Sequence, residues 1–507
     1  MNTPDFLIQN VKEYPNEPAL SSKNKTGNWE TDSWNDVYTS VMDVAKSLLY
    51  HNIGQNDKIS IYSYNRKEWN YIYLATQFIN SAAVGIYHTS SSNEVEWVAG
   101  NSESKIIFVG NNPNDNQEND KMPINRLLEA LPKLTNVELV VTLPEVTSSG
   151  NSKIISWDKF IENGKSIESS KVLDLVSKIH DKHTSSLIYT SGTTGNPKGV
   201  ELVHKNWNFL MDALSTPLTF FQGEKTISWL PGAHVFGQAL DNHFWVRRAM
   251  HSFIVDNPLN TVDFAKEVQP HLFCSVPRIY EKIYSNFIAA IESKAVLRFG
   301  LNIPILSGIL KKKLKEAAGF GDLKFAISGA APINPDILAL FQKLDIPLYE
   351  GYGMTENTAG ATLNYLGHNK IGSVGKALPD TEIKIANDGE VMIQGDHVMK
   401  GYYKNPEATT ETLVDRWLHT GDIGKLDSDG YLYITGRKKE IYVSSAGKNI
   451  APLVIEETMK SIPIVSQCFL VGDGRKYCSA LFTLDVGAIL RDKLYMNSNQ
   501  IPKDPYN

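Results

Sequence analysis

The sequence has few cysteines and no long run of apolar residues. Three cysteines, Cys274, Cys468 and Cys478, are spread over 507 residues. They are too few and too scattered for a disulfide framework, and no CxxC or HExxH spacing indicates a zinc site, so we expect a reducing, cytoplasmic compartment. No stretch of about 18 apolar residues occurs, and the N-terminus lacks a basic region followed by an apolar core. We therefore expect neither a membrane span nor a secretion signal.

The sequence also lacks an excess of basic charge. Lys and Arg number 50 against 56 Asp and Glu, which gives a formal net charge of −6. Without a long basic run or a pI above 9, the sequence offers no extended basic surface for a nucleic-acid backbone, and we exclude nucleic acid as a partner. Hydrophobic residues make up 42% of the chain, as in ordinary globular proteins. The length allows one large unit and a smaller one.

Short β-rich runs alternate with helix-like stretches through most of the chain. Apolar residues recur at helical spacing between residues 34 and 51, and residues 261–268 also read as helix. The β-rich runs occupy residues 58–64, 82–88, 105–110, 137–143, 185–190, 225–230, 271–276 and 323–329. This strand-then-helix order predicts a large α/β domain with parallel sheets. The polar segment 111–120 is predicted to be a surface loop.

The pattern changes after Gly372. Short strands with turns at residues 381–385, 389–395 and 429–435 predict a small antiparallel or barrel-like subdomain. After the basic cluster at residues 436–440, a helix at 451–461 and strands at 467–473 and 477–484 predict a compact α+β tail. We place a domain boundary near Arg437. It divides the chain into an N-terminal domain of residues 1–436 and a small, incomplete C-terminal domain of residues 437–507.

The most informative stretch is YTSGTTGNPKGV at residues 189–200. Its glycines let backbone N–H groups point into one concavity, its hydroxyls can donate to phosphate oxygens, and Lys198 adds a positive charge, so the loop suits a polyphosphate. A Walker A loop is excluded because Pro197 precedes the lysine and Gly199 follows it. A short GTTG string alone would be explained by a hydrophilic turn after a strand, whereas the full twelve-residue string favours the phosphate-binding loop.

This string resembles the signature loop of the adenylate-forming superfamily, which includes acyl-CoA synthetases, luciferases and peptide-synthetase adenylation domains. Five further similarities follow in the family's order. They are WLPGAHVFG (229–237), LKFAISGAAP (323–332), YEGYGMTE (349–356), RWLHTGDIG (416–424) and TGRKKEIYVSSAGKNIAP (435–452). The resemblance therefore covers residues from about 185 to 452. Within the superfamily, these motif sequences look most like those of long-chain fatty acid CoA ligases.

The resemblance implies particular site residues. Those implied to bind the nucleotide or coenzyme A are Thr190, Ser191, Gly192, Thr193, Thr194, Gly195, Lys198, Gly329, Ala330, Ala331, Glu350, Gly351, Tyr352, Gly353, Met354, Thr355, Asp422, Arg437, Lys439 and Gly447. The implied catalytic residues are Lys198, Thr193, Glu356 and His234, with Mg²⁺ on Glu356 and Thr193. His234 aligns with the gate of the acyl pocket, Lys439 with the hinge, and Gly447 with the pantetheine tunnel.

The chemistry of these residues supports several of the implied roles, but each residue also has a simpler explanation that involves no ligand. Hard carboxylate oxygens such as those of Glu356 suit Mg²⁺, and the Asp422 carboxylate can accept both ribose hydroxyls. Taken alone, Glu356 reads as a solvated residue, Asp422 as part of a turn and Arg437 as a salt-bridge partner. His234 taken alone reads as a core histidine.

The resemblance implies an ATP-dependent long-chain fatty acid CoA ligase. Fatty acid, ATP and coenzyme A are the implied substrates, with Mg²⁺ as cofactor. Two roles explain the aromatic residues equally well: they could line a pocket for an alkyl chain, or they could pack in the core. These residues are Trp229, Phe236, Phe244, Trp245 and Phe273. Residues 295–315, an apolar run followed by KKKLK, suit either a peripheral membrane contact or a solvated helix end. His243 and His251 match no motif.

The sequence departs from the family near its end. The Pro-Thr-x-x-x-Lys-like string that carries the adenylation lysine does not occur before Asn507, and Lys493 and Lys503 lie in no matching context. We therefore expect the first half-reaction to be weakened. The alternative function is a nucleotide- and acyl-binding homologue that is impaired in catalysis.

Overall fold

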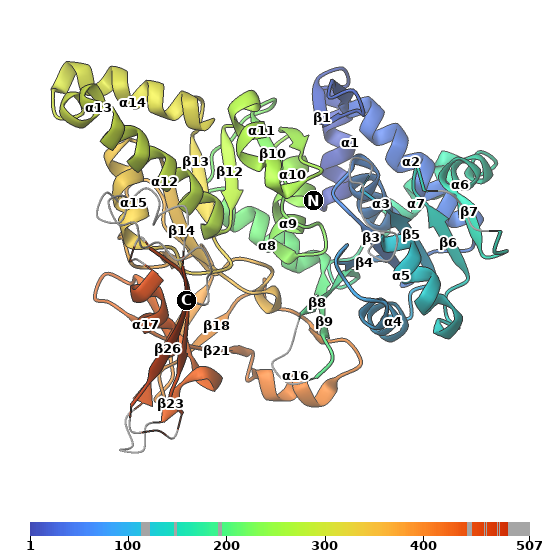
Figure 1. Ribbon diagram of the computed structural model, residues 1–507. Helices are drawn as coiled ribbons and strands as arrows, with labels where there is room; N and C mark the ends of the chain where they lie inside the picture. The colour runs from blue at the N-terminus through green and yellow to red at the C-terminus, as the bar shows by residue number, and fades with distance from the viewer. Residues whose placement is uncertain are drawn as a thin grey trace.

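The computed structural model describes residues 1–112, 122–146, 150–190, 195–443, 449–460, 462, 464–473, 475 and 477–484. Within these ranges, two α/β lobes stand side by side and a smaller part rich in strands lies below them (Figure 1). No helix among the described residues combines the length and apolar character needed to cross a bilayer.

The first lobe is built on a mostly parallel sheet. Its strands are β3 (Lys58–Ser63), β4 (Ala82–Ile86), β5 (Ile106–Gly110), β6 (Leu139–Thr142), β7 (Ile154–Ser156), β8 (Thr184–Thr190), β9 (Lys198–Val203) and β19 (Gly401–Tyr402). They lie in the order β19-β9-β8-β4-β3-β5-β6-β7, with β9 antiparallel to both β8 and β19. Strands β4 and β5 are buried along their whole length, as expected where helices cover both faces of a parallel sheet.

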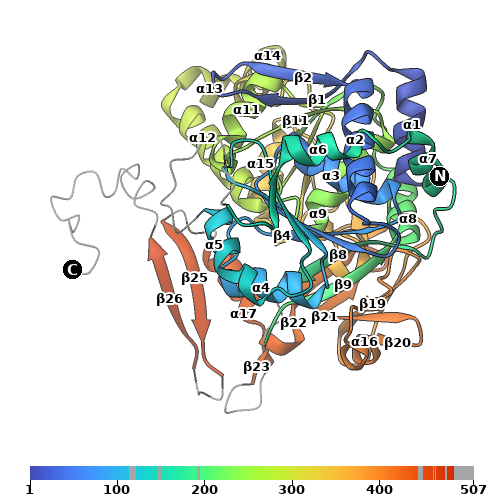
Figure 2. The same ribbon diagram turned by 90° about the vertical axis from the view of Figure 1, so that its right-hand side faces the viewer.

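The second lobe is built on another mostly parallel sheet. Its strands are β1 (Pro18–Lys23), β2 (Trp29–Ser33), β10 (Lys225–Ser228), β11 (His251–Ile254), β12 (Leu272–Ser275), β13 (Phe325–Ser328), β14 (Leu348–Tyr352), β15 (Thr362–Leu363) and β16 (Lys376–Ala377). Their order is β16-β15-β14-β13-β12-β10-β11-β1-β2. The N-terminal hairpin β1–β2 thus extends the edge of this sheet, where Figure 2 shows it at the top of the view.

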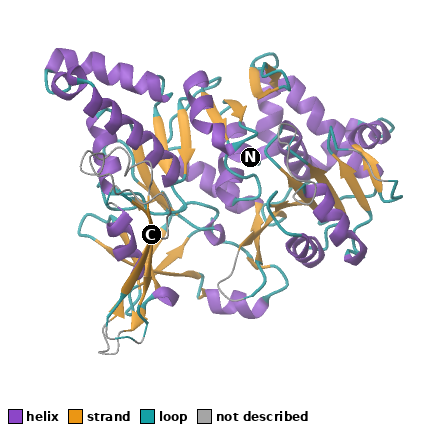
Figure 3. Ribbon diagram, viewed as in Figure 1, coloured by secondary structure: helices purple, strands orange, loops and turns teal. Residues whose placement is uncertain are grey.

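Helices flank both sheets (Figure 3). In the first lobe they are α1 (Thr3–Glu13), α2 (Trp34–Tyr50), α3 (Lys67–Phe78), α4 (Ser92–Asn101), α5 (Pro123–Ala130), α6 (Trp157–Gly164) and α7 (Ser169–Val176). The later helices are α8 (His204–Leu214), α9 (Val235–Gln238), α10 (Trp245–Arg247), α11 (Thr261–Val268), α12 (Pro277–Ser293), α13 (Ala295–Gly300), α14 (Pro304–Ala318) and α15 (Pro335–Lys343).

Local chemistry explains where the predicted helix α2 begins. The Ser33 hydroxyl accepts the Asp36 backbone N–H, and the Asp36 carboxylate accepts the Ser33 N–H, a capping box that satisfies two unpaired donors. Val37, Val41, Val44 and Leu48 then form the buried stripe. The helix predicted from apolar spacing is confirmed, and so is the predicted helix at residues 261–268.

The smaller part is antiparallel, as the sequence predicts. It contains β17 (Glu382–Ile385), β18 (Glu390–Gln394), β20 (Leu413–Val414), β21 (Trp417–Leu426) and β22 (Leu432–Arg437), and helix α16 (Pro406–Thr412) lies beside it. Beyond it follow β23 (Tyr442–Val443), β24 (Asn449–Ile450), α17 (Pro452–Lys460), β25 (Val465–Val471) and β26 (Ser479–Leu484). The α+β character predicted for the tail is confirmed.

One large apolar core runs through both lobes. It includes Ile59 and Phe108 from the first sheet and Ile227 and Leu272 from the second. Gly85 in β4 allows the sheet to approach the segment after β10, because a Cβ at Gly85 would stand 2.5 Å from the Cα of Ala233. The lobes are therefore joined by shared packing.

Candidate active site

The loop between β8 and β9 is fixed at both ends. Thr190 and Lys198 pair across the two antiparallel strands at the mouth of the loop. Gly195 adopts a φ of 118°, a conformation that favours glycine. The carbonyl of Pro197 accepts the indole N–H of Trp97 at 2.9 Å. Ser191, Gly192, Thr193 and Thr194, which the sequence also assigned to this site, lie outside the described residues.

Glu356 lies in a short 3-10 turn (Thr355–Asn357) after β14 and is buried. The hydroxyl of Tyr402 in β19 donates to its Oε1 at 2.7 Å. Lys198 Nζ stands 4.8 Å from the centre of the same tyrosine ring. The structure therefore brings together two predicted residues, Glu356 and Lys198, through a third that the sequence did not indicate.

Burial raises the pKa of Glu356, and the hydrogen bond from Tyr402 and the positive charges of Arg437 and Lys198 oppose this rise. Burial and the Glu356 charge together raise the pKa of Tyr402, so its hydroxyl stays protonated and remains a donor. A desolvated carboxylate of this kind gains from a bound cation.

Asp422 is the buried centre of a second group. The hydroxyl of Tyr352 donates to its Oδ2 at 2.6 Å, and Arg437 Nε lies 3.1 Å from its Oδ1. Burial raises the pKa of Asp422, and the bond from Tyr352 and the charge of Arg437 offset part of the rise. Strand pairing fixes this geometry because Asp422 in β21 lies opposite Arg437 in β22.

Glu390 in β18 supports the turn that carries Asp422. Its Oε1 accepts the N–H of Gly421 at 2.9 Å, and its Oε2 contacts His419 and Lys438, each at 3.1 Å. Burial is the largest single influence and raises the pKa of Glu390, but the hydrogen bonds from His419, Lys438 and the Gly421 N–H, together with the charge of Lys438, outweigh it and lower the pKa overall. No sequence motif singled out Glu390, Tyr402 or Trp97, because their roles depend on contacts with distant segments.

The loop after β13 contains Gly329, Ala330 and Ala331, the residues that the resemblance assigns to the adenine wall. Ala330 has a φ of 66°, and both alanines are exposed. A Cβ at Gly329 would stand 3.5 Å from the ring of Phe236, so this loop lies against α9. Glu350, in the neighbouring strand β14, is buried, and its Oε1 accepts the Ile333 N–H at 3.3 Å.

The turn after β14 is compact. A Cβ at Gly353 would stand 2.1 Å from the carbonyl oxygen of Ala359, so a larger residue cannot fit without backbone movement. The N–H of Met354 donates to Asn357 Oδ1 at 2.7 Å. Gly351 packs beside Leu363, and Thr355 is buried. These contacts hold Glu356 at the carboxyl end of β14.

His234 caps α9, because its Nδ1 accepts the N–H of Phe236 at 3.1 Å. Burial lowers its pKa, so the ring is neutral at pH 7. It follows the carboxyl end of β10, as Gly329 and Glu356 follow β13 and β14, and Thr190 is the last residue of β8. Ligands of α/β folds bind at such carboxyl ends. Lys439 is exposed in a 3-10 turn (Lys438–Glu440), and Gly447 lies outside the described residues.

Most of the aromatic residues offered as an acyl lining are core residues. Phe244, Trp245 and Phe273 are fully buried. Trp245 stacks on Trp34 with ring centroids 5.2 Å apart. The indole N–H of Trp229 donates to the Cys274 carbonyl at 2.8 Å. The core-packing alternative explains these four side chains, and Phe236 is the one of the set that borders the site.

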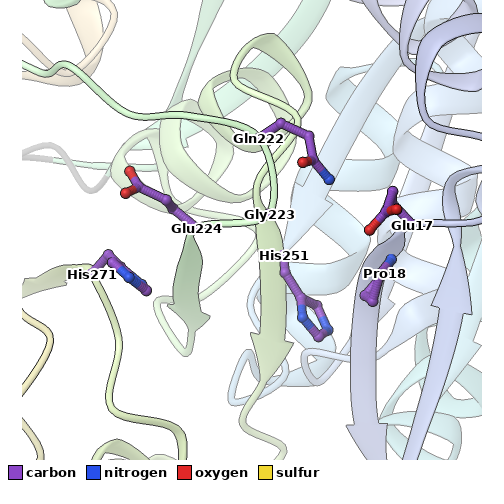
Figure 4. A pocket seen from close by; sticks show the side chains of 7 residues that line it. All are labelled: Glu17, Pro18, Gln222, Gly223, Glu224, His251 and His271. Atoms are coloured by element: carbon purple, nitrogen blue, oxygen red, sulfur yellow. The ribbon is translucent and has the colours of Figure 1, made fainter.

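The two unassigned histidines have structural contacts. His243 is buried and contacts the hydroxyls of Thr3 at 2.6 Å and Tyr73 at 2.7 Å. His251 contacts Ser21 Oγ at 2.8 Å and borders a cavity of about 300 Å³. Figure 4 shows this cavity, which is lined by Glu17, Pro18, Gln222, Gly223, Glu224, His251 and His271. It lies at the amino ends of β1, β10 and β11, away from the site.

A single carboxylate fits the expected metal. No group of three or more His, Cys, Asp or Glu in the described ranges is placed to hold a metal ion by itself. Mg²⁺ in nucleotide enzymes is commonly held by one or two carboxylates together with substrate phosphates. The buried Glu356 carboxylate therefore fits a cation that arrives with a nucleotide.

Comparison with known proteins gives consistent matches over most of the chain. The AMP-binding enzyme family matches residues 7–403. The long-chain-fatty-acid–CoA ligase FadD15 of Mycobacterium tuberculosis is 30% identical over 485 residues, 90% of this chain and 78% of that protein. The long-chain-fatty-acid–CoA ligase ACSBG2 of Homo sapiens is 31% identical over 523 residues, 96% of this chain and 76% of that protein.

Solved structures share the fold. The anthranilate CoA ligase AuaEII in complex with anthranoyl-AMP superposes with a TM-score of 0.78 at 19% identity, over 96% of this chain and 87% of that one. A fatty acyl CoA synthetase of Mycobacterium tuberculosis gives a TM-score of 0.69 at 22% identity, over 96% of this chain and 88% of that one. The predicted fold class is confirmed. The alternative of a homologue impaired in catalysis gains no support from these matches, and Lys493 and Lys503 lie outside the described residues.

Proposed function

The chain belongs to the AMP-binding enzyme family, and from this we propose that it is a long-chain-fatty-acid–CoA ligase that activates its acid with ATP. The substrate class is supported by the named activity of FadD15 and ACSBG2 at 30% and 31% identity. We propose the two-step reaction in which fatty acid and ATP give acyl-AMP and pyrophosphate, and acyl-AMP and coenzyme A then give acyl-CoA and AMP.

One observation carries the proposal: the Tyr402 hydroxyl donates to the buried Glu356 carboxylate at 2.7 Å, and Lys198 Nζ lies 4.8 Å from the centre of the same ring. The hairpin β21–β22 is linked to β14 by the hydrogen bond from Tyr352, which ends β14, to Asp422, and we propose that these segments form one nucleotide site. Lys198 supplies positive charge for phosphates, and Asp422 offers a carboxylate for ribose hydroxyls. Together, Lys198 and Asp422 would match the phosphate and the ribose parts of one nucleotide.

We propose that adenylation needs no general base in this site. A fatty acid is ionised at pH 7, and its carboxylate attacks the α-phosphorus of ATP while pyrophosphate leaves. The loop of residues 190–198 binds the phosphates through N–H groups, hydroxyls and Lys198. Mg²⁺ held by Glu356, with Thr193 as the second proposed ligand, offsets phosphate charge when bound. Gly329, Ala330 and Ala331 would form the wall for adenine.

The second step is proposed to use the C-terminal domain. The coenzyme A thiol attacks the mixed anhydride, forming the thioester bond, and AMP leaves. We propose a rotation of residues 437–507 relative to residues 1–436 about Lys439, with Gly447 lining the path of the pantetheine arm. His234 is proposed to stand at the entrance to the acyl pocket as a neutral ring.

The test is mass spectrometry of products from the full chain incubated with Mg-ATP, coenzyme A and a mixture of fatty acids. We expect acyl-CoA and AMP in equal amounts, with the highest yields for long chains. Glu356→Gln is the matched inactive control because it keeps size and removes charge. Folded protein that binds ATP but forms neither acyl-CoA nor AMP would overturn the proposal.

A further inference from the structure

Helices α13 and α14 form a hairpin at one end of the second lobe. Both views place it at the opposite end of the molecule from β25 and β26 (Figures 1 and 2). Gly300 ends α13 against α14, since a Cβ there would stand 2.7 Å from Leu310 and 2.8 Å from Leu306. Leu310, Leu314 and Ala318 bury one face of α14, which packs against α11. The hairpin is therefore anchored to the lobe by one face only.

The hairpin also exposes large apolar side chains. They are Val296, Phe299, Ile303, Ile305 and Ile309. Phe299 is 66% exposed and Ile305 is 86% exposed. Ile305 and Ile309 are one helical turn apart and lie on the face opposite Leu314. A single exposed apolar residue is ordinary, but several on one projecting element mark an interaction surface.

The same hairpin carries exposed basic residues. Between Lys294 and Lys315 the sequence contains six Lys or Arg residues and no Asp or Glu, although the whole chain has a net charge of −6. Glu292 and Glu316 flank this stretch. Lys311 pairs with Asp345 of the lobe at 2.9 Å, and Lys312 Nζ lies 3.9 Å from Glu316 Oε1. Lys294, Arg298, Lys312 and Lys313 are exposed, and the last two continue the face of Ile305 and Ile309 by one turn.

From this combination we infer that the hairpin α13–α14 docks on the surface of an anionic lipid bilayer. The apolar side chains enter the boundary between headgroups and acyl chains, and the exposed basic side chains contact lipid phosphates. A second copy of this chain is a poorer occupant, because a symmetric contact would place the same positive charges against each other. The inference does not depend on the proposed function.

The inference concerns a surface separate from the candidate site. Helix α12 begins after the carboxyl end of β12 and ends at α13, so its 17 residues separate the site from the hairpin. A helix of that length spans about 25 Å. Substitutions on the hairpin therefore leave Glu356, Asp422 and His234 untouched, which allows binding to lipid to be measured independently of activity.

The test is sedimentation of the full chain with two kinds of vesicle, phosphatidylcholine alone and phosphatidylcholine with about 30% phosphatidylglycerol. We expect partitioning to the anionic vesicles to be at least about tenfold stronger, and to fall in about 0.5 M NaCl because screening removes the electrostatic part. Phe299→Ser combined with Ile305→Ser and Ile309→Ser, and separately Lys312→Glu with Lys313→Glu, should each weaken it about tenfold.

Matched controls come from other exposed positions. Leu259 is 81% exposed in a different part of the surface, so Leu259→Ser repeats the apolar-to-polar change. Lys165 and Lys171 are exposed beside α6 and α7, so Lys165→Glu with Lys171→Glu repeats the change in net charge. Both controls should bind anionic vesicles as the unchanged protein does, and ATP binding confirms that every variant is folded.

Three results would overturn the inference. One is absence of binding to anionic vesicles by the unchanged, folded protein. Another is equal loss of binding in the Lys312/Lys313 variant and in the Lys165/Lys171 control, which would show dependence on net charge alone. The third is a dimer in size-exclusion chromatography that the hairpin variants abolish, without vesicle binding, which would assign the surface to a second copy.

Discussion

Two buried carboxylates of the site each accept a hydrogen bond from a tyrosine. Tyr402 donates to Glu356 and Tyr352 donates to Asp422. A phenol fixes the orientation of a carboxylate without neutralising it, which leaves the charge available to a ligand. Tyr402 also separates Glu356 from Lys198, whose ammonium lies over its ring. We interpret both tyrosines as positioning residues.

Tyr402→Phe tests this positioning role. It keeps the ring beneath Lys198 and removes the hydroxyl, so we expect the Mg²⁺ concentration for half-maximal activity to rise and kcat to fall by about tenfold, the effect of one lost hydrogen bond to a charged group. Glu356→Gln should lower kcat by at least about a hundredfold. The measurement is pyrophosphate release against Mg²⁺ concentration.

The neighbouring Tyr403 supplies the control for Tyr402→Phe. Its hydroxyl contacts Glu103 at 3.2 Å on the exposed surface, so Tyr403→Phe removes the same group without touching Glu356. We expect unchanged kinetics from it. Equal kinetic changes in both variants would show that Tyr402 has no specific part in holding the carboxylate.

Asp241 gives a prediction for pH dependence. Burial raises its pKa from 3.8 to about 8, so the folded protein keeps this proton where the unfolded chain has lost it. The free energy of unfolding therefore falls as pH rises from about 4 to about 8, by up to about 1.4 kcal/mol per pH unit. Asp241→Asn removes the titrating group and with it this pH-dependent fall in the free energy of unfolding. Its stabilisation relative to the unchanged protein should grow between about pH 5 and about pH 8 in urea unfolding.

Asp181→Asn is the control for the Asp241 substitution. Asp181 is exposed, so its replacement should change the free energy of unfolding by less than about 0.5 kcal/mol at either pH. A stabilisation by Asp241→Asn that stays constant from acid to neutral pH would contradict the assignment of a buried, protonated carboxyl.

At the scale of elements, local sequence patterns predict where strands and helices occur, but they do not predict which strands lie next to each other in the sheets. The predicted runs at residues 58–64, 82–88 and 105–110 become β3, β4 and β5. The N-terminal hairpin was not predicted, and β1 pairs with β11, so Ser21 contacts His251 across 230 positions. The spacing of apolar residues predicts that a strand is buried, but it does not predict which strand pairs with it.

Gly85→Ala tests how the two lobes pack. The new methyl group would meet the backbone of Ala233, so either β4 or the segment that leads to His234 must shift. We expect a loss of about 1–3 kcal/mol in the free energy of unfolding, the usual cost of overpacking. Denaturant unfolding measures it.

Gly54→Ala is the matched control for Gly85→Ala. A Cβ at Gly54 meets no atom within 4 Å, so this variant should stay within about 0.5 kcal/mol of the unchanged protein. Equal unfolding curves for the two variants would show that the close approach of β4 and Ala233 does not constrain the lobes.

At the scale of the whole molecule, helix α12 connects the end of β12 to the hairpin α13–α14. If both proposals hold, docking brings the site to the membrane in which its substrate dissolves. Lys312→Glu with Lys313→Glu should then lower kcat/KM by about tenfold for fatty acid supplied in anionic vesicles. The same acid supplied in solution with cyclodextrin should be used at an unchanged rate. Product formation by mass spectrometry measures both, and an equal loss under the two conditions would contradict a docking role.

The sequence by itself determined the α/β class, a helix between residues 34 and 51 and the order of the motifs, because periodicity and contiguous strings are local properties. It also indicated Lys198, Glu356 and Asp422 as candidate site residues. Only the tertiary structure decided which side chains meet: Tyr402 and Glu356 are 46 positions apart, and Tyr352 and Asp422 are 70 apart. It also decided which face of α14 is buried, since that depends on packing against α11. Strand order and helix packing bring distant residues together, and neither is encoded in any single segment.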